Sequence, residues 1–344
     1  MVQLRTDDLS KALYDALLSD YPDHRKDTRP VHAVGIGVTG YFTPSKAAAT
    51  YCVAEQFASA NVPVTIRFSN GSGSPIEHDD ALDVRGMATK FHLGGDRVAD
   101  LIMITLPVFF AQDPDKFLAF ARAGRPKFDP VPSWWQRLKD KLLLRPDRTR
   151  PDPRDAKDGS LGVLRYANKH VAARPGTVAA LMLVTPTSYA RATYHALHSF
   201  KMTAPDGVVR FVRLSWEPVA GVRPIDPATT MAEDFLHSEL ASRLAKEPAR
   251  FVLRMDVAGQ GDAIDDPTKI WDTTRLRVVL GELFITALVA DQQRDCEKLS
   301  FNPTRVVAGL ECSNDPILAA RGDAYEYSCA LRGGSGCPVV REQR

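Results

Sequence analysis

Two residues near the carboxyl end of the chain, Arg321 and Tyr325, have types and a spacing that could do chemistry on a metal ion. They stand four apart in RGDAYEYSCALR, which has the composition of a helix, and side chains at i and i+4 share one helix face. Arginine stays protonated at any accessible pH, and a permanent cation beside a phenol favours the phenolate. A phenolate is a hard anionic donor that suits ferric iron, and tyrosine is one of the few axial ligands of haem.

A haem enzyme that handles peroxide also needs an imidazole opposite the tyrosine, to take a proton from the incoming peroxide and return it to the departing oxygen. His32, which enters a β-like segment after Arg29-Pro-Val, is the candidate. Each feature alone has an ordinary interpretation, because a surface arginine can lie over a packed tyrosine and a single histidine before a strand is usually packed or exposed. The surrounding elements therefore decide between the interpretations.

Most of the elements that must position these residues are predicted to be β-strands. Segments rich in Val, Ile, Thr and Phe are separated by Gly, Asn and Asp turns, as in an antiparallel sheet or barrel. They cover residues 32–42, 62–70, 84–93, 100–110, 180–186, 208–216, 251–259 and 277–288, and residues 188–202 are predicted to be either a strand or a helix.

Helices are predicted at the start of the chain and at two places further along it. Residues 1–28 contain three leucines at helical spacing, with acidic residues where an export signal would be apolar, which predicts an amphipathic N-terminal helix. Residues 113–124 and 231–248 are predicted to be two further helices. The 125–158 stretch is dense in Pro, Arg, Lys and Asp and contains a short amphipathic helix, and residues 333–344 are predicted to be a flexible tail.

Composition limits the classes of partner. The 344 residues are 44% hydrophobic and 25% charged, with a net charge of +2 and no block of like charges, so we expect neither nucleic acid nor an anionic membrane as partner. No run approaches the ~18 apolar residues of a membrane span. Five cysteines at irregular spacing, without a C-x-x-C pair, predict free thiols in a reducing, cytoplasmic setting and no zinc site.

Several motifs, in the same order along the chain, resemble those of the haem catalases. RPVHAVGIGVTGYF resembles their distal-histidine motif, TIRFSNGSG their Arg-Phe-Ser segment, and DVRGMATKFHL their Asp-x-Arg-Gly strand. DLIMITLPVFFAQDPDKF resembles the strand and turn over the haem face, and the sequence from DDPTKIWDTTRL to RGDAYEYS resembles the approach to the proximal helix. The likeness covers residues 29–120 and 180–332.

The resemblance implies an α+β fold, a catalase-like antiparallel eight-stranded β-barrel with flanking helices. Residues 1–344 would form a single haem domain that lacks the long wrapping and C-terminal segments of full-size catalases. The implied cofactor is haem b, iron protoporphyrin IX.

Matched position by position, the resemblance implies roles for the residues that do the chemistry. His32 becomes the distal acid and base, and Tyr325 the proximal iron ligand whose phenolate charge Arg321 maintains. Ser69 matches the hydroxyl that accepts a hydrogen bond from the distal imidazole and fixes its orientation. Asp83 matches a carboxylate in the channel by which peroxide arrives, although an aspartate before a strand also fits an ordinary capping role.

A second set of matched residues would bind the cofactor. Arg29, Arg67 and Arg332 match the arginines that hold the haem propionates, where charge-assisted hydrogen bonds suit a carboxylate. Phe117 matches the ring that covers the distal haem face, and Val31 the aliphatic residue beside the histidine.

One departure from the catalase pattern is informative. Catalases carry an asparagine at the position of Ile104, where its amide helps to hold peroxide, and Thr105 on the opposite face does not obviously replace it. The loss of such a polar contact costs about 1 to 3 kcal/mol, or about one to two powers of ten in rate. The step in which a second peroxide is oxidised to dioxygen should suffer most.

The short chain and Ile104 together make the sequence similar to the small catalase-related haem peroxidases. Such an enzyme would reduce hydrogen peroxide or an organic hydroperoxide with a small organic electron donor, with weak catalase activity at most. Two alternatives stay open: a fatty-acid hydroperoxide-converting enzyme like the allene oxide synthases, which Ile104 disfavours, and a non-catalytic haem store or sensor. The sequence does not decide whether the chain forms a homodimer.

Overall fold

The computed structural model describes residues 6–18, 28–124, 160–226 and 228–333, together with residues 135, 138, 139, 142 and 143. The short helix predicted within 125–158 and the tail predicted at 333–344 lie almost wholly outside the described part of the chain. The N-terminal helix predicted within residues 1–28 is seen as α1, Thr6–Leu17.

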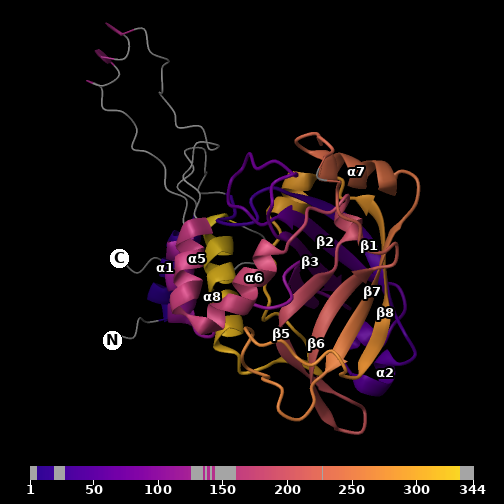
Figure 1. Ribbon diagram of the computed structural model, residues 1–344. Coiled ribbons are helices and arrows are strands. Elements are labelled where there is room, and N and C mark those ends of the chain that lie inside the picture. The colour runs from indigo at the N-terminus through magenta and orange to yellow at the C-terminus, as the bar shows by residue number, and fades with distance from the viewer. Residues whose placement is uncertain are drawn as a thin grey trace.

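Within the described residues, eight antiparallel strands close into a barrel, so this prediction is confirmed (Figure 1). The hydrogen-bonded order is β4-β3-β2-β1-β8-β7-β6-β5, and the pairing of Ile104 with His195 joins β4 to β5 and closes the ring. The short strand β9 also pairs with β5. The strands are β1 Gly35–Pro44, β2 Val62–Asn70, β3 Arg85–His92, β4 Val98–Ile104, β5 Tyr194–Thr203, β6 Val209–Pro218, β7 Ala249–Val257, β8 Arg277–Leu288 and β9 Leu310–Cys312.

Alternation along the strands determines which side chains face the barrel interior. On β2, Val64, Ile66 and Phe68 belong to the barrel core. Because successive side chains point to opposite faces, Arg67 and Ser69 point outward from the barrel. They are nevertheless only 3% and 4% exposed, so this outer face must be covered by other elements.

Helices cover that face. Helices α1, α5, α6 and α8 gather on one side of the barrel, whereas α7 lies apart from them (Figure 1), and α8 contacts both α1 and α3. Helices α3 and α8 each begin with an aspartate that caps a backbone amide and is followed by proline. The helices after α1 are α2 Ala48–Tyr51, α3 Pro114–Ala123, α5 Ser160–Lys169, α6 Arg174–Leu181, α7 Phe235–Leu244 and α8 Pro316–Leu331, with the shorter turns η1 Glu55–Phe57, η3 Val171–Ala173, η4 Tyr189–Arg191 and η5 Gln293–Glu297.

The β segment predicted at residues 180–186 is wrong. Helix α6 extends to Leu181, and the residues that follow form no strand beyond an isolated bridge at Pro186. A short apolar run does not distinguish a strand from a buried helix. A proline in the first turn of α6 is the local signal that favours the helix.

The prediction of five free thiols is also wrong. Cys52, Cys296 and Cys312 are free, but Cys329, in the last turns of α8, is disulfide-bonded. Spacing in an irregular set of cysteines does not determine which thiols meet in the fold. The free-thiol argument for a cytoplasmic setting therefore no longer holds, and that setting stays a prediction.

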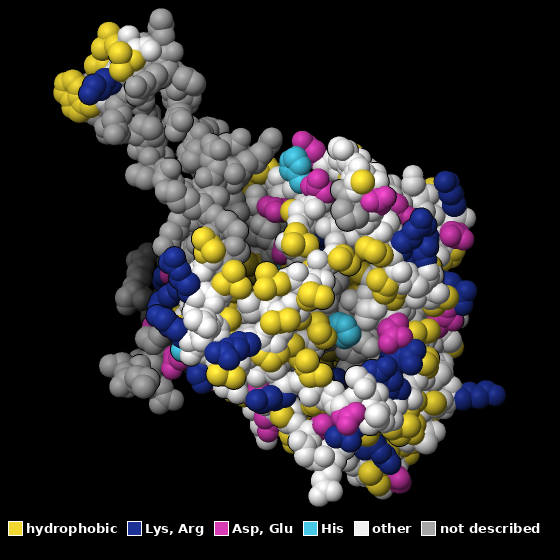
Figure 2. All heavy atoms as spheres, viewed as in Figure 1, with side chains coloured by type: hydrophobic (Ala, Val, Ile, Leu, Met, Phe, Trp, Pro, Cys, Tyr) yellow, Lys and Arg dark blue, Asp and Glu magenta, His cyan; other side chains and the backbone are white. Residues whose placement is uncertain are grey.

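The surface carries an apolar area on the side of the helices. Figure 2 shows hydrophobic side chains gathered over α6 and the loop after it, where Val178, Met182 and Val184 are 57%, 76% and 59% exposed. An exposed apolar patch often marks a surface that contacts another molecule. Among the described helices, none is both long and apolar enough to cross a membrane.

Candidate active site

A cavity of about 260 Å³ lies between the outer face of the barrel and the helices that cover it. Strands β2, β3 and β4 contribute to one wall, and helices α1, α3 and α8 contribute to the other. All the residues predicted for the catalytic and cofactor site line it: Arg29, Val31, His32, Arg67, Ser69, Phe117, Arg321, Tyr325 and Arg332. The fold thus brings together residues that are far apart in the sequence.

His32 lies in the loop before β1 and has a φ of 57°, a left-handed conformation that costs about 1 kcal/mol or more. Its amide donates to Gly71 O at 3.0 Å, and its Nδ1 lies 3.0 Å from Ser69 Oγ. Gly86 makes room for the pair, because a Cβ there would lie 2.6 Å from Ser69 Oγ and 2.9 Å from His32 Nδ1. These contacts fix the ring and leave Nε2 as the nitrogen available to the cavity.

The surroundings of His32 keep its imidazole neutral. Burial and the positive charges of Arg67 and Arg321 lower the pKa of His32 from 6.5 to about 3. In the tautomer that protonates Nδ1, this nitrogen donates to Ser69 Oγ, and Nε2 keeps a lone pair. The ring can therefore accept a proton from a ligand in the cavity.

The wall formed by the end of β4 is apolar. Ile102, Ile104 and Leu106 line the cavity there. Thr105 is not among the lining residues, since its hydroxyl accepts a hydrogen bond from the Arg85 amide at 3.0 Å. No amide from β4 therefore helps His32 to hold a ligand at the position of Ile104.

Asp83, predicted as a channel carboxylate, bonds to the backbone instead. Its oxygens accept hydrogen bonds from the amides of Ser72 and Val84 at 2.6 and 2.7 Å. It is not among the residues that line the cavity. This arrangement is the capping role that the sequence left open.

Tyr325 lines the cavity from α8, one turn after Arg321. The guanidinium carbon of Arg321 lies 5.8 Å from the centre of the Tyr325 ring, so the two side chains share one helix face as their spacing predicts. Gly322 lets α8 approach the preceding segment, because a Cβ there would lie 2.7 Å from Thr304. Since Arg321 is only 8% exposed, its positive charge is buried beside the phenol.

A buried chain of polar contacts behind Arg321 was missed by the sequence-based prediction. Arg321 Nη1 donates to His198 Nε2 at 2.7 Å, and His198 Nδ1 donates to Asp315 Oδ2 at 2.6 Å. Burial lowers the pKa of His198 and outweighs the opposing effect of Asp315. The His198 ring is therefore neutral. Asp315 Oδ1 also caps α8 at the Ile317 amide, so the start of the helix fixes the direction of the Arg321 guanidinium.

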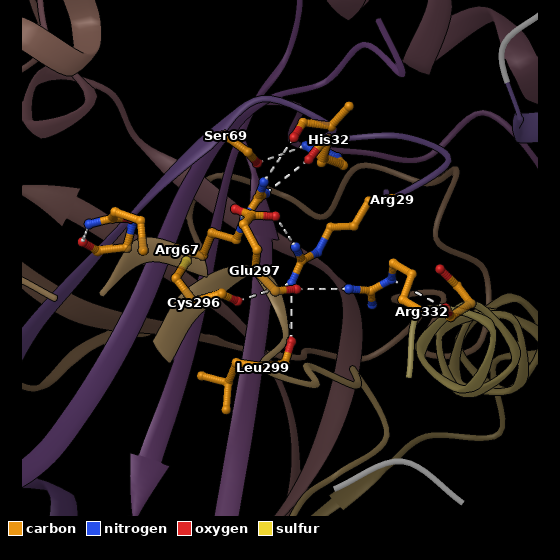
Figure 3. A network of polar contacts seen from close by, with 12 residues as sticks. Arg29, His32, Arg67, Ser69, Cys296, Glu297, Leu299 and Arg332 are labelled. Carbon is orange, nitrogen blue, oxygen red and sulfur yellow. Dashed lines mark hydrogen bonds and ion pairs between the residues drawn. The ribbon is translucent and has the colours of Figure 1, made fainter. Parts of the chain in front are cut away.

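Three arginines and Glu297 form a second polar group at the cavity (Figure 3). Arg29 Nη1 and Arg67 Nε donate to the two carboxylate oxygens of Glu297 at 2.5 and 2.9 Å. Arg332 Nη1 donates to the backbone oxygen of Glu297 at 3.0 Å. The arginines line the cavity, whereas Glu297 does not. Sequence reasoning found the three arginines and missed the glutamate.

Aromatic side chains close the cavity on the side of α3. Phe117 packs against Phe109 and Phe110, with ring centres 5.1 and 5.8 Å apart, and all three line the cavity. Tyr14 and Leu17 add to the wall from α1. The α3 side of the cavity is therefore suited to a flat apolar ligand.

The donor set fits an iron porphyrin. The phenol of Tyr325 and the imidazole of His32 reach one cavity from the helix side and from the barrel side, and tyrosine is among the axial ligands of haem. The three arginines carry three positive charges against the single carboxylate of Glu297, and this excess of two positive charges suits the propionates of the porphyrin.

Comparison with known protein sequences finds relatives along most of the chain. A family model described as Catalase matches residues 11–134 and 169–337. The chain is 34% identical over 309 residues to the Catalase-related peroxidase of Mycolicibacterium paratuberculosis, covering 89% of each chain. It is 28% identical over 305 residues to the Catalase-related peroxidase of Synechococcus elongatus, covering 88% of this chain and 82% of that protein.

Larger relatives match over part of their length. Catalase-2 of Bacillus subtilis is 27% identical over an alignment 344 positions long, gaps included, which covers 92% of this chain and 45% of that protein. A solved structure titled "Structure of a bacterial catalase" has a TM-score of 0.74 at 19% identity, and the match covers 90% of this chain and 58% of that chain. At this identity the likeness supports the fold alone, and it confirms that the barrel is catalase-like.

Proposed function

This chain belongs to the catalase family, and from that premise we propose that it is a haem-dependent peroxidase. It reduces hydrogen peroxide or an organic hydroperoxide with electrons from a small organic donor, and it has weak catalase activity at most. Residues 1–344 act as a single haem domain, and the cofactor is haem b. The supporting observation is that His32 and Ser69 line the same cavity as Arg321 and Tyr325.

The residues of the cavity divide into those that bind the cofactor and those that act on peroxide. Bound haem supplies the redox chemistry, because its iron can take oxidising equivalents from peroxide and pass them to a donor. Tyr325 would bind the iron through its phenolate oxygen, and Arg321 places a compensating positive charge beside the ring. Arg29, Arg67 and Arg332 line the same cavity and would hold the propionates, and Val31 and Phe117 would lie against the porphyrin face.

His32 moves a proton. Its Nε2 accepts the proton of the incoming hydroperoxide and then donates it to the departing oxygen, so that the leaving group is water or an alcohol. Ser69 Oγ accepts the hydrogen bond from Nδ1 and keeps the ring in the tautomer that this transfer requires.

Ile104→Asn should restore part of the catalase reaction. An amide at this position can hold peroxide beside His32, so we expect oxygen evolution to rise by about tenfold relative to dye oxidation. Ile102→Asn is the control, because it adds the same amide two residues earlier on the same strand and at the same cavity. If Ile104→Asn leaves the ratio unchanged, the shape of the access route and not this side chain limits oxygen evolution.

His198→Gln should disturb Tyr325 without touching it. Removing the ring separates Arg321 from Asp315, and we expect the unfolding free energy to fall by about 2 kcal/mol and the ferric absorption bands to shift. His195→Gln is the control, because His195 stands three residues earlier on β5 and does not line the cavity. A spectrum that is the same in both variants would show that this chain of contacts serves stability alone.

Steady-state assays separate the proposed function from its alternatives. A peroxidase consumes hydrogen peroxide in proportion to a dye reductant, whereas an allene oxide synthase-like enzyme converts a fatty-acid hydroperoxide without one. A haem store or sensor turns over neither. We expect consumption that depends on the dye; conversion of lipid hydroperoxide alone would replace this proposal with the first alternative.

A homodimer and a cytoplasmic setting stay predictions. The exposed apolar side chains of Val178, Met182 and Val184 offer a surface that a second copy could cover. The disulfide at Cys329 does not favour a reducing compartment, in which disulfides are uncommon.

A further inference from the structure

Glu297 contacts three arginines of the cavity but does not line the cavity itself (Figure 3). We propose that Glu297 positions Arg29 and Arg67 for a ligand with two carboxylates and thereby makes the chain selective for the two propionates of its porphyrin. This inference rests on the proposed haem function and assigns a role to a residue that the haem chemistry does not itself require.

The first support is geometric, because each carboxylate oxygen of Glu297 accepts a hydrogen bond from a different arginine. Arg29, in the loop before β1, also donates to Leu299 O at 3.0 Å, but Glu297 is the carboxylate that it shares with Arg67, on β2. Arg67 is confined further by its bond to His32 O at 2.9 Å and by Gly35, where a Cβ would lie 2.5 Å from its guanidinium carbon. Glu297 thus links the two guanidinium groups to each other, and Arg67 links them to the loop that carries His32.

The second support is the charge of the group. Burial and the repulsion from Arg67 lower the pKa of Arg29 to about 9, and the same two causes lower the pKa of Arg332. Glu297 opposes this in both arginines, and the charges of Arg67, Arg29 and Arg332 in turn lower the pKa of Glu297 despite its burial. Three positive charges and one negative charge leave two positive charges in excess, which equals the charge of two propionates.

Two simpler roles for Glu297 make different predictions. An ion pair that only stabilises the fold would change the affinity for every porphyrin by the same factor. A carboxylate that only competes with the propionates would, when removed, increase the preference for a porphyrin that carries them. A positioning role predicts the opposite, because Arg29 and Arg67 would repel one another and lose their shared orientation.

The test compares two ligands on the haem-free protein. The dissociation constants of iron protoporphyrin IX and of its dimethyl ester are measured by absorption titration for the wild type and for Glu297→Gln. We expect the wild type to prefer the free acid, and Glu297→Gln to reduce this preference by about tenfold. Glu217→Gln is the matched control, because Glu217 bonds to Arg254 at 2.8 Å with 32% side-chain exposure, against 29% for Glu297, and lies outside the cavity lining.

The outcomes are distinct. A preference that is unchanged or increased in Glu297→Gln overturns the positioning role while the proposed haem function stands. Should Glu297→Gln not fold, Glu297→Asp keeps the charge but cannot span both arginines, and a wild-type preference in that variant overturns the role equally. If the wild type takes up neither porphyrin, both this inference and the proposed function fail.

Discussion

Tyr325→Phe should purify with at least about tenfold less haem than the wild type and without the ferric phenolate absorption. The substitution removes one oxygen atom and keeps the ring that packs in α8, so the fold should be retained. The loss of haem would follow from the loss of the metal–ligand bond, since the remaining contacts to the porphyrin are propionate bonds and apolar packing. Haem content and the absorption spectrum are measured together.

Tyr327→Phe is the control for this experiment. Tyr327 stands two residues further along α8, packs against Tyr14 with ring centres 5.5 Å apart, and does not line the cavity. It should keep the wild-type haem content and spectrum. Normal haem content with an unchanged spectrum in Tyr325→Phe would remove this residue as the iron ligand.

His32→Ala should bind haem normally but react with hydrogen peroxide about 100-fold more slowly or worse, because it lacks the proton acceptor. Stopped-flow absorption measures the reaction of the ferric enzyme with peroxide in the absence of a donor. His92→Ala is the control, since His92 bonds to Thr65 at 2.8 Å and lies outside the cavity lining. An unchanged rate in His32→Ala would contradict the proton-transfer role.

The lowered pKa of His32 determines how the rate of the reaction with peroxide depends on pH. Because the pKa of His32 is lowered to about 3, its imidazole stays unprotonated, and the rate with peroxide should be level from about pH 8 to about pH 5. A histidine with the ordinary pKa of 6.5 would lose its base form within that range. A fall centred near pH 6.5 in the wild type that disappears in His32→Ala would show that the imidazole is not shielded in this way.

The barrel and the residues that line the cavity could be predicted from the sequence, for two physical reasons. Strands such as Val62–Asn70 alternate core and outward side chains, and helices such as α3 carry both a cap and an amphipathic pattern. Residues of a local motif with fixed spacing, such as the segment that contains His32, stay close to one another when the chain folds. Residues 180–186 contain no such signal themselves, because the proline that favours helix α6 stands before them, and their apolar composition alone gave the wrong element.

The supporting residues were not accessible because their roles depend on contacts between distant segments. His198 lies within β5 and Asp315 at the start of α8, and only the folded chain brings them together behind Arg321. Asp315 carried the signal of a helix cap, but nothing nearby in sequence indicated that its second oxygen holds a histidine. Glu297 belongs to a charged turn after β8, and its sequence indicates an exposed connection. Only the folded chain shows that Arg29 and Arg67 bond to it.

The absorption spectrum of the purified wild-type protein loaded with haem tests the central claim most directly. A porphyrin iron that is bound by Tyr325, with the neutral imidazole of His32 kept off the metal, should give the bands of a high-spin ferric haem with phenolate character. A colourless protein that takes up no haem, or a low-spin spectrum typical of two nitrogen ligands, would contradict it.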